Sequence, residues 1–351
     1  MKVIDISGSG AGNTTIKGQQ AGEFYGNSLA VADVDGNGLE DLLVGAPHYT
    51  DYDDSDLKYE IGRVYIYYQD ATSIGKSWSV LKGSSIGGRF GHAIASLGDV
   101  NGDGFNDVAI SAPYEDHGNV YIYFGSASGL RSEPGQVISG NRFSLRAFGF
   151  SLTGNADVDG NGYADLAVGA YQSDAIVYLP ASPVIRMTNL SLVFEPAQIS
   201  LKSRDTQRLN EKGQVVFCSS LTFCLAYTGY NLRQSTTFNV SLDLDYKQTN
   251  IRRLFFLKDN MSSKSFVLAV QKDVVQCNNE DVCVRSDIID KLTPMDTQMA
   301  VQVVNNDPLT ADLPPVLDAF GPQSITNSIK IANNCGDDGV CVPDLELNAI
   351  A

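Results

Sequence analysis

One sequence unit occurs three times in the first half of the chain, and this repetition limits the folds available to it. The copies read ADVDGNGLEDLLVGA from Ala32, GDVNGDGFNDVAISA from Gly98 and ADVDGNGYADLAVGA from Ala156. Each copy follows an aromatic-Gly pair and precedes a β-rich run such as VYIYY from Val64. Their first aspartates are 66 and 58 residues apart. Short strands, Gly-rich turns and this long period predict β-propeller blades, each too thin to bury its own faces.

Each copy places oxygen-bearing side chains at positions 1, 3, 5 and 9 of a loop. They are Asp33, Asp35, Asn37 and Asp41, then Asp99, Asn101, Asp103 and Asp107, then Asp157, Asp159, Asn161 and Asp165. Glycines at positions 4 and 6 let the backbone wrap around an ion, so the position-7 carbonyl of Leu39, Phe105 or Tyr163 can join the set. Oxygen-only ligands select a hard cation, and a flexible cage suits Ca²⁺ better than Mg²⁺. We therefore predict three calcium ions.

Two other interpretations of these loops are weaker. Asp/Asn-Gly hairpin turns are common and need no metal, but three copies with matching ligands favour calcium. An EF-hand requires a bidentate Glu at position 12, where this chain has Val44, Ile110 and Val168. The flanking runs also read as strands, so the loops join strands and not helices.

Charge is distributed unevenly along the chain. The 25 Lys and Arg and 41 Asp and Glu give a net charge of −16, of which residues 1–182 carry −12. So acidic a region argues against binding to nucleic acid or anionic lipid, and for bound cations.

All six cysteines lie in the second half, and none has the C-x-x-C spacing of zinc sites. They are Cys218, Cys224, Cys277, Cys283, Cys335 and Cys341. An even number confined to one region predicts disulfides and an oxidising, extracellular setting. Four N-x-S/T sequons begin at Asn13, Asn189, Asn239 and Asn260. Chance alone gives nearly as many in this composition, so the motifs add little by themselves.

The second half also contains strands with a period of two. From Phe238 to Tyr246, apolar residues alternate with Asn239, Ser241, Asp243 and Asp245. This pattern predicts a strand buried on one side, with Asn239 facing solvent. Several such runs without a helical period fit an antiparallel Ig-like sandwich.

The repeats resemble the FG-GAP blades of integrin α subunits, whose seven-bladed propellers carry such calcium loops in their last blades. Later segments look like the integrin thigh domain and its junction with calf-1: FCSSLTFCLAYTGYN from Phe217, NIRRLFFL from Asn250, DKLTPM from Asp290 and NNCGDDGVCVPDLEL from Asn333. The resemblance implies an all-β chain, with a partial β-propeller of three calcium-binding blades followed by an Ig-like β-sandwich. Its implied parts are 1–21 (remnant of a preceding blade), 22–182 (three blades), 183–334 (thigh) and 335–351 (genu and start of calf-1).

The same resemblance implies a function. The chain is expected to be an ectodomain part of a cell-adhesion receptor at the cell surface, paired with an integrin β subunit and anchored by a segment outside this sequence. Ligands on the extracellular matrix or on other cells would bind mainly through four earlier blades that this chain lacks. No ligand-contacting residue can be assigned, and no nucleic acid partner is expected.

Disulfide pairing follows partly from geometry and partly from the resemblance. If the strand around them is extended, Cys218 and Cys224 lie about 20 Å apart and cannot bond to each other. The family resemblance pairs Cys224 with Cys277 and leaves Cys218 with Cys283. A cysteine that relatives carry upstream of the Cys218 position is missing here. Cys335 and Cys341 enclose a turn-forming stretch, which predicts a local bridge.

Enzymatic function is not expected. The three histidines, His48, His92 and His117, are interpreted as structural or solvated, and neither a G-x-S-x-G elbow nor a phosphate loop occurs. No catalytic residue is therefore assigned. The alternative functions are a secreted calcium-dependent propeller module and an accessory region of a calcium-dependent hydrolase.

Overall fold

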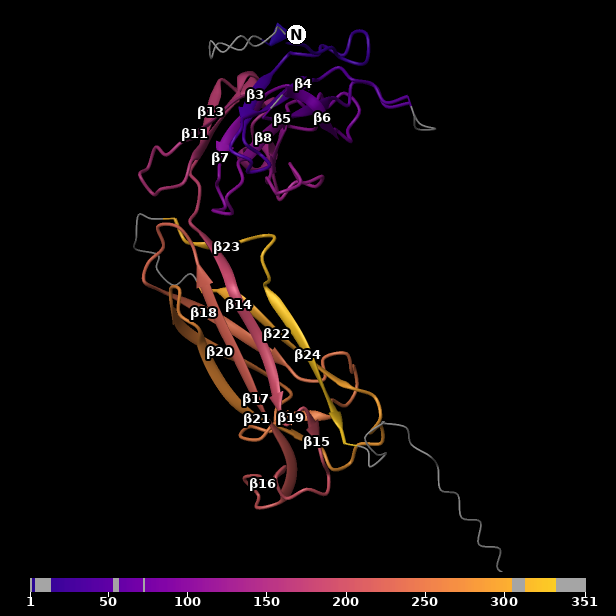
Figure 1. Cartoon of the computed structure of the whole chain (residues 1–351), viewed down its shortest axis with the longest axis vertical. Helices are drawn as coiled ribbons and strands as arrows, with labels where there is room; N and C mark the ends of the chain where they lie inside the picture. The colour runs from indigo at the N-terminus through magenta and orange to yellow at the C-terminus, as the bar shows by residue number, and fades with distance from the viewer. Residues whose placement is uncertain (1, 4–13, 53–56, 72, 305–312, 333–351) are drawn as a thin grey trace, which may run out of the picture. The chain divides into compact units, whose positions relative to one another are not determined.

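The computed structural model describes residues 2–3, 14–52, 57–71, 73–304 and 313–332 (Figure 1). The chain divides into two compact units, with the main boundary between Val184 and Ile185. Both units consist of strands, and the helices in the described part are the short 3-10 turns η1 (Gly140–Phe143) and η2 (Tyr171–Ser173). No helix in these ranges is long and apolar enough to cross a bilayer. The all-β prediction is confirmed.

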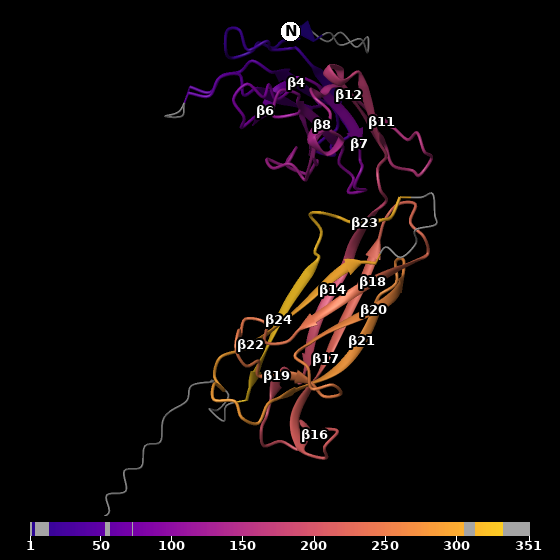
Figure 2. The same cartoon turned by 180° about the vertical axis from the view of Figure 1, so that it is seen from behind.

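The first unit contains three antiparallel blades in which strands pair in chain order (Figures 1 and 2). Blade one has β3 (Leu29–Ala32), β4 (Asp41–Ala46), β5 (Arg63–Asp70) and β6 (Ser73–Lys82). Blade two has β7 (Ile94–Gly98), β8 (Asp107–Ala112), β9 (Asn119–Tyr123) and β10 (Gln136–Ser139). Blade three has β11 (Phe148–Ala156), β12 (Asp165–Ala170) and β13 (Ala175–Leu179). A separate pair, β1 (Lys2–Val3) with β2 (Thr14–Thr15), precedes them.

Two apolar cores of this unit lie between neighbouring blades. One joins Leu43 and Ile66 of blade one to Ile110 of blade two. The other joins Val120 of blade two to Val168 of blade three. These side chains are 0% exposed, so each blade is buried by its neighbour, as the repeat predicted.

The aromatic-Gly pairs take part in this packing. Gly62 and Gly118, just before the third strands of blades one and two, have φ of 82° and 99°. A Cβ at either position would collide with the carbonyl oxygen of Phe90 or Phe148 in the next blade. Because glycine is present, Phe90 and Phe148 pack against the backbone and are 2% and 0% exposed.

The second unit is a sandwich of two sheets. One sheet has the order β19-β21-β17-β14-β23, with β16 pairing β17 on the side; the other has the order β15-β24-β22-β18-β20. The first-sheet strands are β14 (Val184–Glu195), β16 (Gln207–Leu209), β17 (Val215–Thr228), β19 (Leu254–Phe256), β21 (Gln276–Val284) and β23 (Val316–Leu317). The second-sheet strands are β15 (Gln198–Ile199), β18 (Ser235–Asp243), β20 (Ser263–Gln271), β22 (Met295–Val303) and β24 (Ser324–Ile331).

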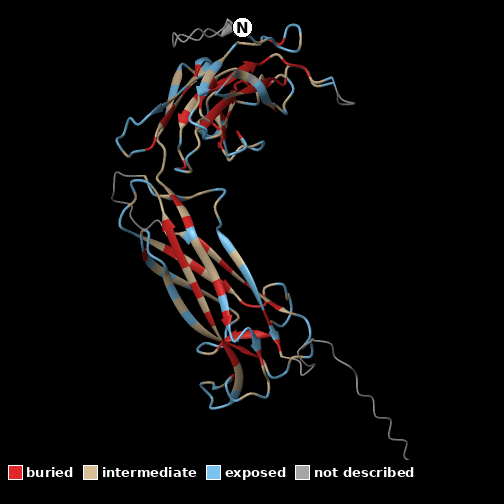
Figure 3. Ribbon diagram, in the orientation of Figure 1, coloured by how far each residue is buried: buried red, intermediate tan, exposed pale blue. Residues whose placement is uncertain are grey.

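Buried residues alternate with more exposed ones along the sandwich strands (Figure 3). In β18 the side chains of Phe238, Val240 and Leu242 are 0% exposed, while Asn239 lies half-buried on the outer face. The period-two prediction is confirmed up to Asp243, where the strand ends. It is wrong at Asp245, which is 1% exposed because Arg253 binds both of its carboxylate oxygens, at 2.9 and 2.8 Å.

Two disulfides join β17 to β21. The Cys224–Cys277 and Cys218–Cys283 bonds are both present, and each links residues directly opposite in the ladder. Both predicted pairings are therefore confirmed. The predicted Cys335–Cys341 bridge lies outside the described residues.

Candidate metal centres

Each candidate loop connects the first and second strands of a blade. The first loop runs from Asp33, after β3, to Asp41, the first residue of β4. Position 9 is likewise the first residue of β8 and β12, so Asp107 and Asp165 are fixed by the sheet. The glycines at positions 4 and 6 have positive φ, for example 72° at Gly36 and 85° at Gly38, as a wrapped loop requires.

The position-1 aspartate closes each loop on itself. Asp33 accepts hydrogen bonds from the backbone N–H groups of Asn37 and Gly38, at 3.1 and 2.8 Å. The same two bonds form from residues 103 and 104 to Asp99, and from residues 161 and 162 to Asp157. Repeated hydrogen bonding therefore holds three loops of different sequence in one conformation.

Loops one and three bring three carboxylates together. Oxygens of Asp33, Asp35 and Asp41 lie within 4.8 Å of one another, as do oxygens of Asp157, Asp159 and Asp165. Three carboxylates this close repel one another, and a divalent cation between them relieves the repulsion. These oxygen donors fit a hard cation.

Loop two differs at position 3, which is Asn101. Its third aspartate is Asp103 at position 5, which accepts from the amide Nδ2 of Asn101 at 3.0 Å. Loop three has the reverse arrangement, in which Asn161 at position 5 donates to Asp159 at position 3, at 3.2 Å. Among the described residues, Asp99, Asp103 and Asp107 do not form such a close acidic group.

The position-9 aspartate, besides being a candidate metal ligand, accepts backbone hydrogen bonds that the sequence did not reveal. Asp41 accepts from Val34 N–H at 3.1 Å and from Gln69 N–H, in the third strand, at 2.8 Å. Asp107 likewise accepts from the N–H groups of Val100 and Gly125. Asp165 accepts from those of Val158 and Ala181. This carboxylate therefore ties the loop to the third strand in blade one, and to the residues just after the third strand in blades two and three. The available sequence signal was an aspartate at the start of an apolar run that forms a buried strand.

The three buried carboxylates have different electrostatic surroundings. Burial raises the pKa of Asp41 to about 6 and that of Asp107 to about 8, against the opposing effect of their backbone donors. Burial also acts on Asp165, but the hydroxyl of Tyr178 donates to it at 2.6 Å, and together with backbone donors lowers its pKa. Tyr178 was not predicted from the sequence.

The histidines are held by structural contacts. Nδ1 of His48 lies 3.1 Å from Oε1 of Glu60, and its ring packs at a tilt of 33° against Phe24, with the ring centroids 4.5 Å apart. His92 lies 4.7 Å from Phe150, and the carbonyl of His117 accepts from Phe148 N–H.

Two family models match the chain in order. The FG-GAP repeat matches residues 25–67, 90–123 and 148–181, which are the three blades. The integrin alpha Ig-like domain 1 matches residues 181–334, which contain the sandwich.

Full-chain comparison gives the same result. The chain is 40% identical to integrin alpha-PS2 of Drosophila melanogaster, 35% to integrin alpha-IIb of Homo sapiens and 36% to integrin alpha pat-2 of Caenorhabditis elegans, each over 95% of this chain. The chain belongs to the integrin α-subunit family. It spans 25%, 32% and 30% of the length of these relatives, respectively. The partial propeller and the Ig-like sandwich are therefore those of an integrin α subunit.

Proposed function

We propose that the chain forms part of the extracellular region of a cell-adhesion receptor, pairs with an integrin β subunit, and contributes to binding of extracellular-matrix or cell-surface ligands. One observation carries this proposal: three FG-GAP repeats, within residues 25–181, are followed directly by the integrin Ig-like domain over residues 181–334. The role is non-enzymatic, and the receptor is anchored in the membrane by a segment outside this chain. Neither the hydrolase nor the unrelated secreted module is favoured by these matches.

We further propose that each loop binds one Ca²⁺ through positions 1, 3, 5 and 9 and the position-7 carbonyl. The converging carboxylates of loops one and three support this assignment, and the shared hydrogen-bond pattern extends it to loop two. Bound calcium would neutralise six negative charges and hold each loop closed over the start of a second strand. The proposed boundaries are 22–182 for the blades and 183–334 for the thigh.

Pairing with a β subunit can be tested by co-purification. The full gene product, carrying an affinity tag, would be expressed at the surface of cells together with each integrin β subunit of the source genome. We expect one or more β subunits to co-purify in stoichiometric amount, and an unrelated single-pass receptor to retain none. Failure of every β subunit to co-purify with a folded, surface-exposed product would contradict the proposal.

A further inference from the structure

We infer that Asn260 carries an N-linked glycan whose first sugar packs into a pocket of the sandwich unit. The inference rests on the proposed function in one respect, because it requires passage through the secretory pathway. Asn260-Met261-Ser262 is a sequon, and Asn260 is exposed in the turn between β19 and β20. Its φ of 58° is a conformation that Asn adopts readily in turns.

The turn presents the amide of Asn260 in a fixed orientation. Its backbone N–H donates to the Phe256 carbonyl at 2.9 Å. Arg285 donates to the Asn260 carbonyl at 3.3 Å and to the side-chain Oδ1 at 3.5 Å. No hydrogen bond from Nδ2 to a described residue is present, so the atom that receives a glycan is left available.

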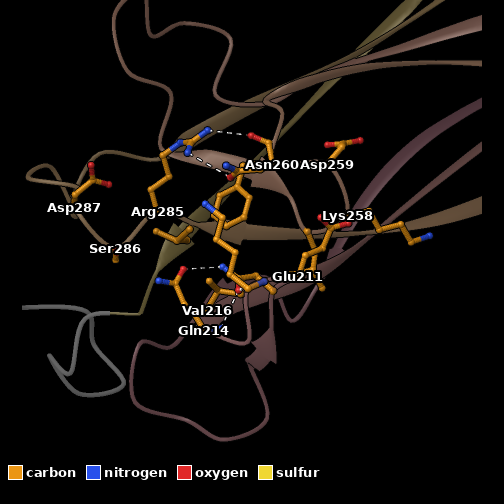
Figure 4. A pocket seen from close by; sticks show the side chains of 14 residues that line it. Glu211, Gln214, Val216, Lys258, Asp259, Asn260, Arg285, Ser286 and Asp287 are labelled. Atoms are coloured by element: carbon orange, nitrogen blue, oxygen red, sulfur yellow. Dashed lines mark hydrogen bonds between the residues drawn. The ribbon is translucent and has the colours of Figure 1, made fainter.

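A pocket of about 260 Å³ adjoins this amide. Figure 4 shows Arg285 reaching toward Asn260 along one side, with Gln214 and Val216 on the opposite wall. Phe255 and Leu257 supply apolar lining, and the Arg285 guanidinium lies 5.2 Å from the Phe255 ring centroid. The volume is below the ~300–1,000 Å³ of drug-sized sites. It suits a single sugar ring, whose apolar face meets the hydrophobic lining and whose hydroxyls meet the polar rim.

The other described sequons lack this setting. Asn189 lies within β14, which is flanked by β17 and β23, and its Oδ1 is buried without a hydrogen-bond partner. Asn239 is half-buried within β18, between β20 and β22. Neither lines the pocket next to Asn260. The structure therefore distinguishes sequons that the sequence alone left equivalent.

The modification is a glycosyl transfer from a lipid-linked diphosphate oligosaccharide. Asn260 Nδ2 bonds to C1 of the first N-acetylglucosamine, and the C1–O bond to the diphosphate breaks. The lipid diphosphate leaves with the electron pair, and one Nδ2 proton passes to a base of the transferase.

Peptide mass spectrometry of the surface-expressed, β-paired protein tests occupancy. We expect the Asn260 peptide to carry the glycan, Asn260→Gln and Ser262→Ala to abolish it, and Ser262→Thr to retain it. A bare Asn260 in a paired receptor would overturn the inference and leave the proposed function standing. A glycosylated Asn260 in a protein that pairs with no β subunit would support the inference and contradict the proposed function.

Hydrogen exchange separately tests whether the first sugar packs into the pocket beside Asn260. The glycan would be trimmed to its first sugar with an endoglycosidase, and the product compared with the unglycosylated Ser262→Ala protein, which keeps Asn260 and its backbone amide. We expect the Phe256 and Asn260 amides to exchange several-fold more slowly when the sugar is present, and Arg285→Lys to remove most of that difference. Lys258→Ala is the matched control, since its ammonium points away from Asn260 (Figure 4). Equal exchange with and without the sugar would overturn the packing part of the inference.

Discussion

The two units differ in what covers the apolar faces of their sheets. In the sandwich unit, the sheets cover each other, and core residues such as Phe223 and Phe238 are 0% exposed. In the blade unit, Ile176 of blade three is 79% exposed, although the equivalent Val64 and Val120 are 0% exposed under the next blade. Leu29 of blade one is 50% exposed. The sandwich supplies its own partner surface, whereas a blade needs neighbours on both sides.

Separating the units should give the largest effect. We expect residues 183–334, secreted from cells, to be monomeric and to unfold cooperatively. Residues 1–182 should associate, because their outer blade faces and strand edges expose apolar surface that further blades would cover. Light scattering and thermal melts of the two fragments measure this directly. A soluble, monomeric 1–182 fragment with a cooperative melt would show that the blades form a self-contained module.

The buried ion pair of the sandwich is the next test. Arg253 is 5% exposed and binds the carboxylates of Asp245 and Asp290 and three backbone carbonyls, so Arg253→Met leaves Asp245 buried without its charged partner. We expect a loss of about 3–5 kcal/mol in the free energy of unfolding of fragment 183–334. The neighbouring Arg252, which pairs with Asp243 at the surface, is the control, and Arg252→Met should change stability by less than about 1 kcal/mol. Equal effects in denaturant unfolding would contradict the structural role of Arg253.

The two disulfides should together stabilise the sandwich unit by less than the sum of what each would contribute as the single bond in the unit. Their partners are 65 and 53 residues apart, but once either bond is present, the other closes a loop of only about 14 residues. Replacing one pair with Ala should cost about 3 kcal/mol, and replacing the second should cost about 4 kcal/mol more. The buried Cys218–Cys283 pair should cost more than the more exposed Cys224–Cys277 pair, because its loss also leaves a cavity. Equal losses of unfolding free energy at both steps would contradict the argument that one disulfide shortens the loop closed by the other.

A pH effect should be the smallest and should act on the blade unit alone. Burial, with Arg89 and His48 nearby, holds the pKa of His92 below its usual value of 6.5. Protonation therefore opposes folding, and stability should fall as pH drops through 6.5 toward more acidic values. In the complete ectodomain, His92→Gln should reduce the pH dependence of the melting temperature of the blades between about pH 5 and 7, and Asp41, whose pKa is about 6, should account for part of the dependence that is left. His117→Gln is the control, and an unchanged pH profile in His92→Gln would contradict this assignment.

Much of the fold was predictable because repetition and alternation leave few choices. Three copies of one unit identified the blades, and the period-two run around Val240 identified a sandwich strand. Alternation could not predict the buried Asp245, because its partner Arg253 comes from a later segment that only the fold brings near. The family resemblance, and not spacing, assigned the disulfide partners.

The candidate metal loops show the same limit. Their ligand spacing was visible in the sequence, but the bond from Asp41 to the third strand requires knowledge of which strands are neighbours. Tyr178 reaches Asp165 from another strand and could not be assigned by spacing. Local chemistry was therefore predictable, whereas support from distant strands was not.

Calcium uptake tests the central claim most directly. Calorimetric titration of the complete ectodomain should detect three sites in the blades, with Kd on the order of 10⁻⁴ to 10⁻³ M. At ~1 mM calcium and a Kd of ~10⁻⁴ M, each ion stabilises the blades by about 1.4 kcal/mol. Fragment 183–334 should bind none of these three ions. Changing Asp33, Asp99 and Asp157 together to Ala should abolish the heat, and an undiminished heat in that variant would contradict the account.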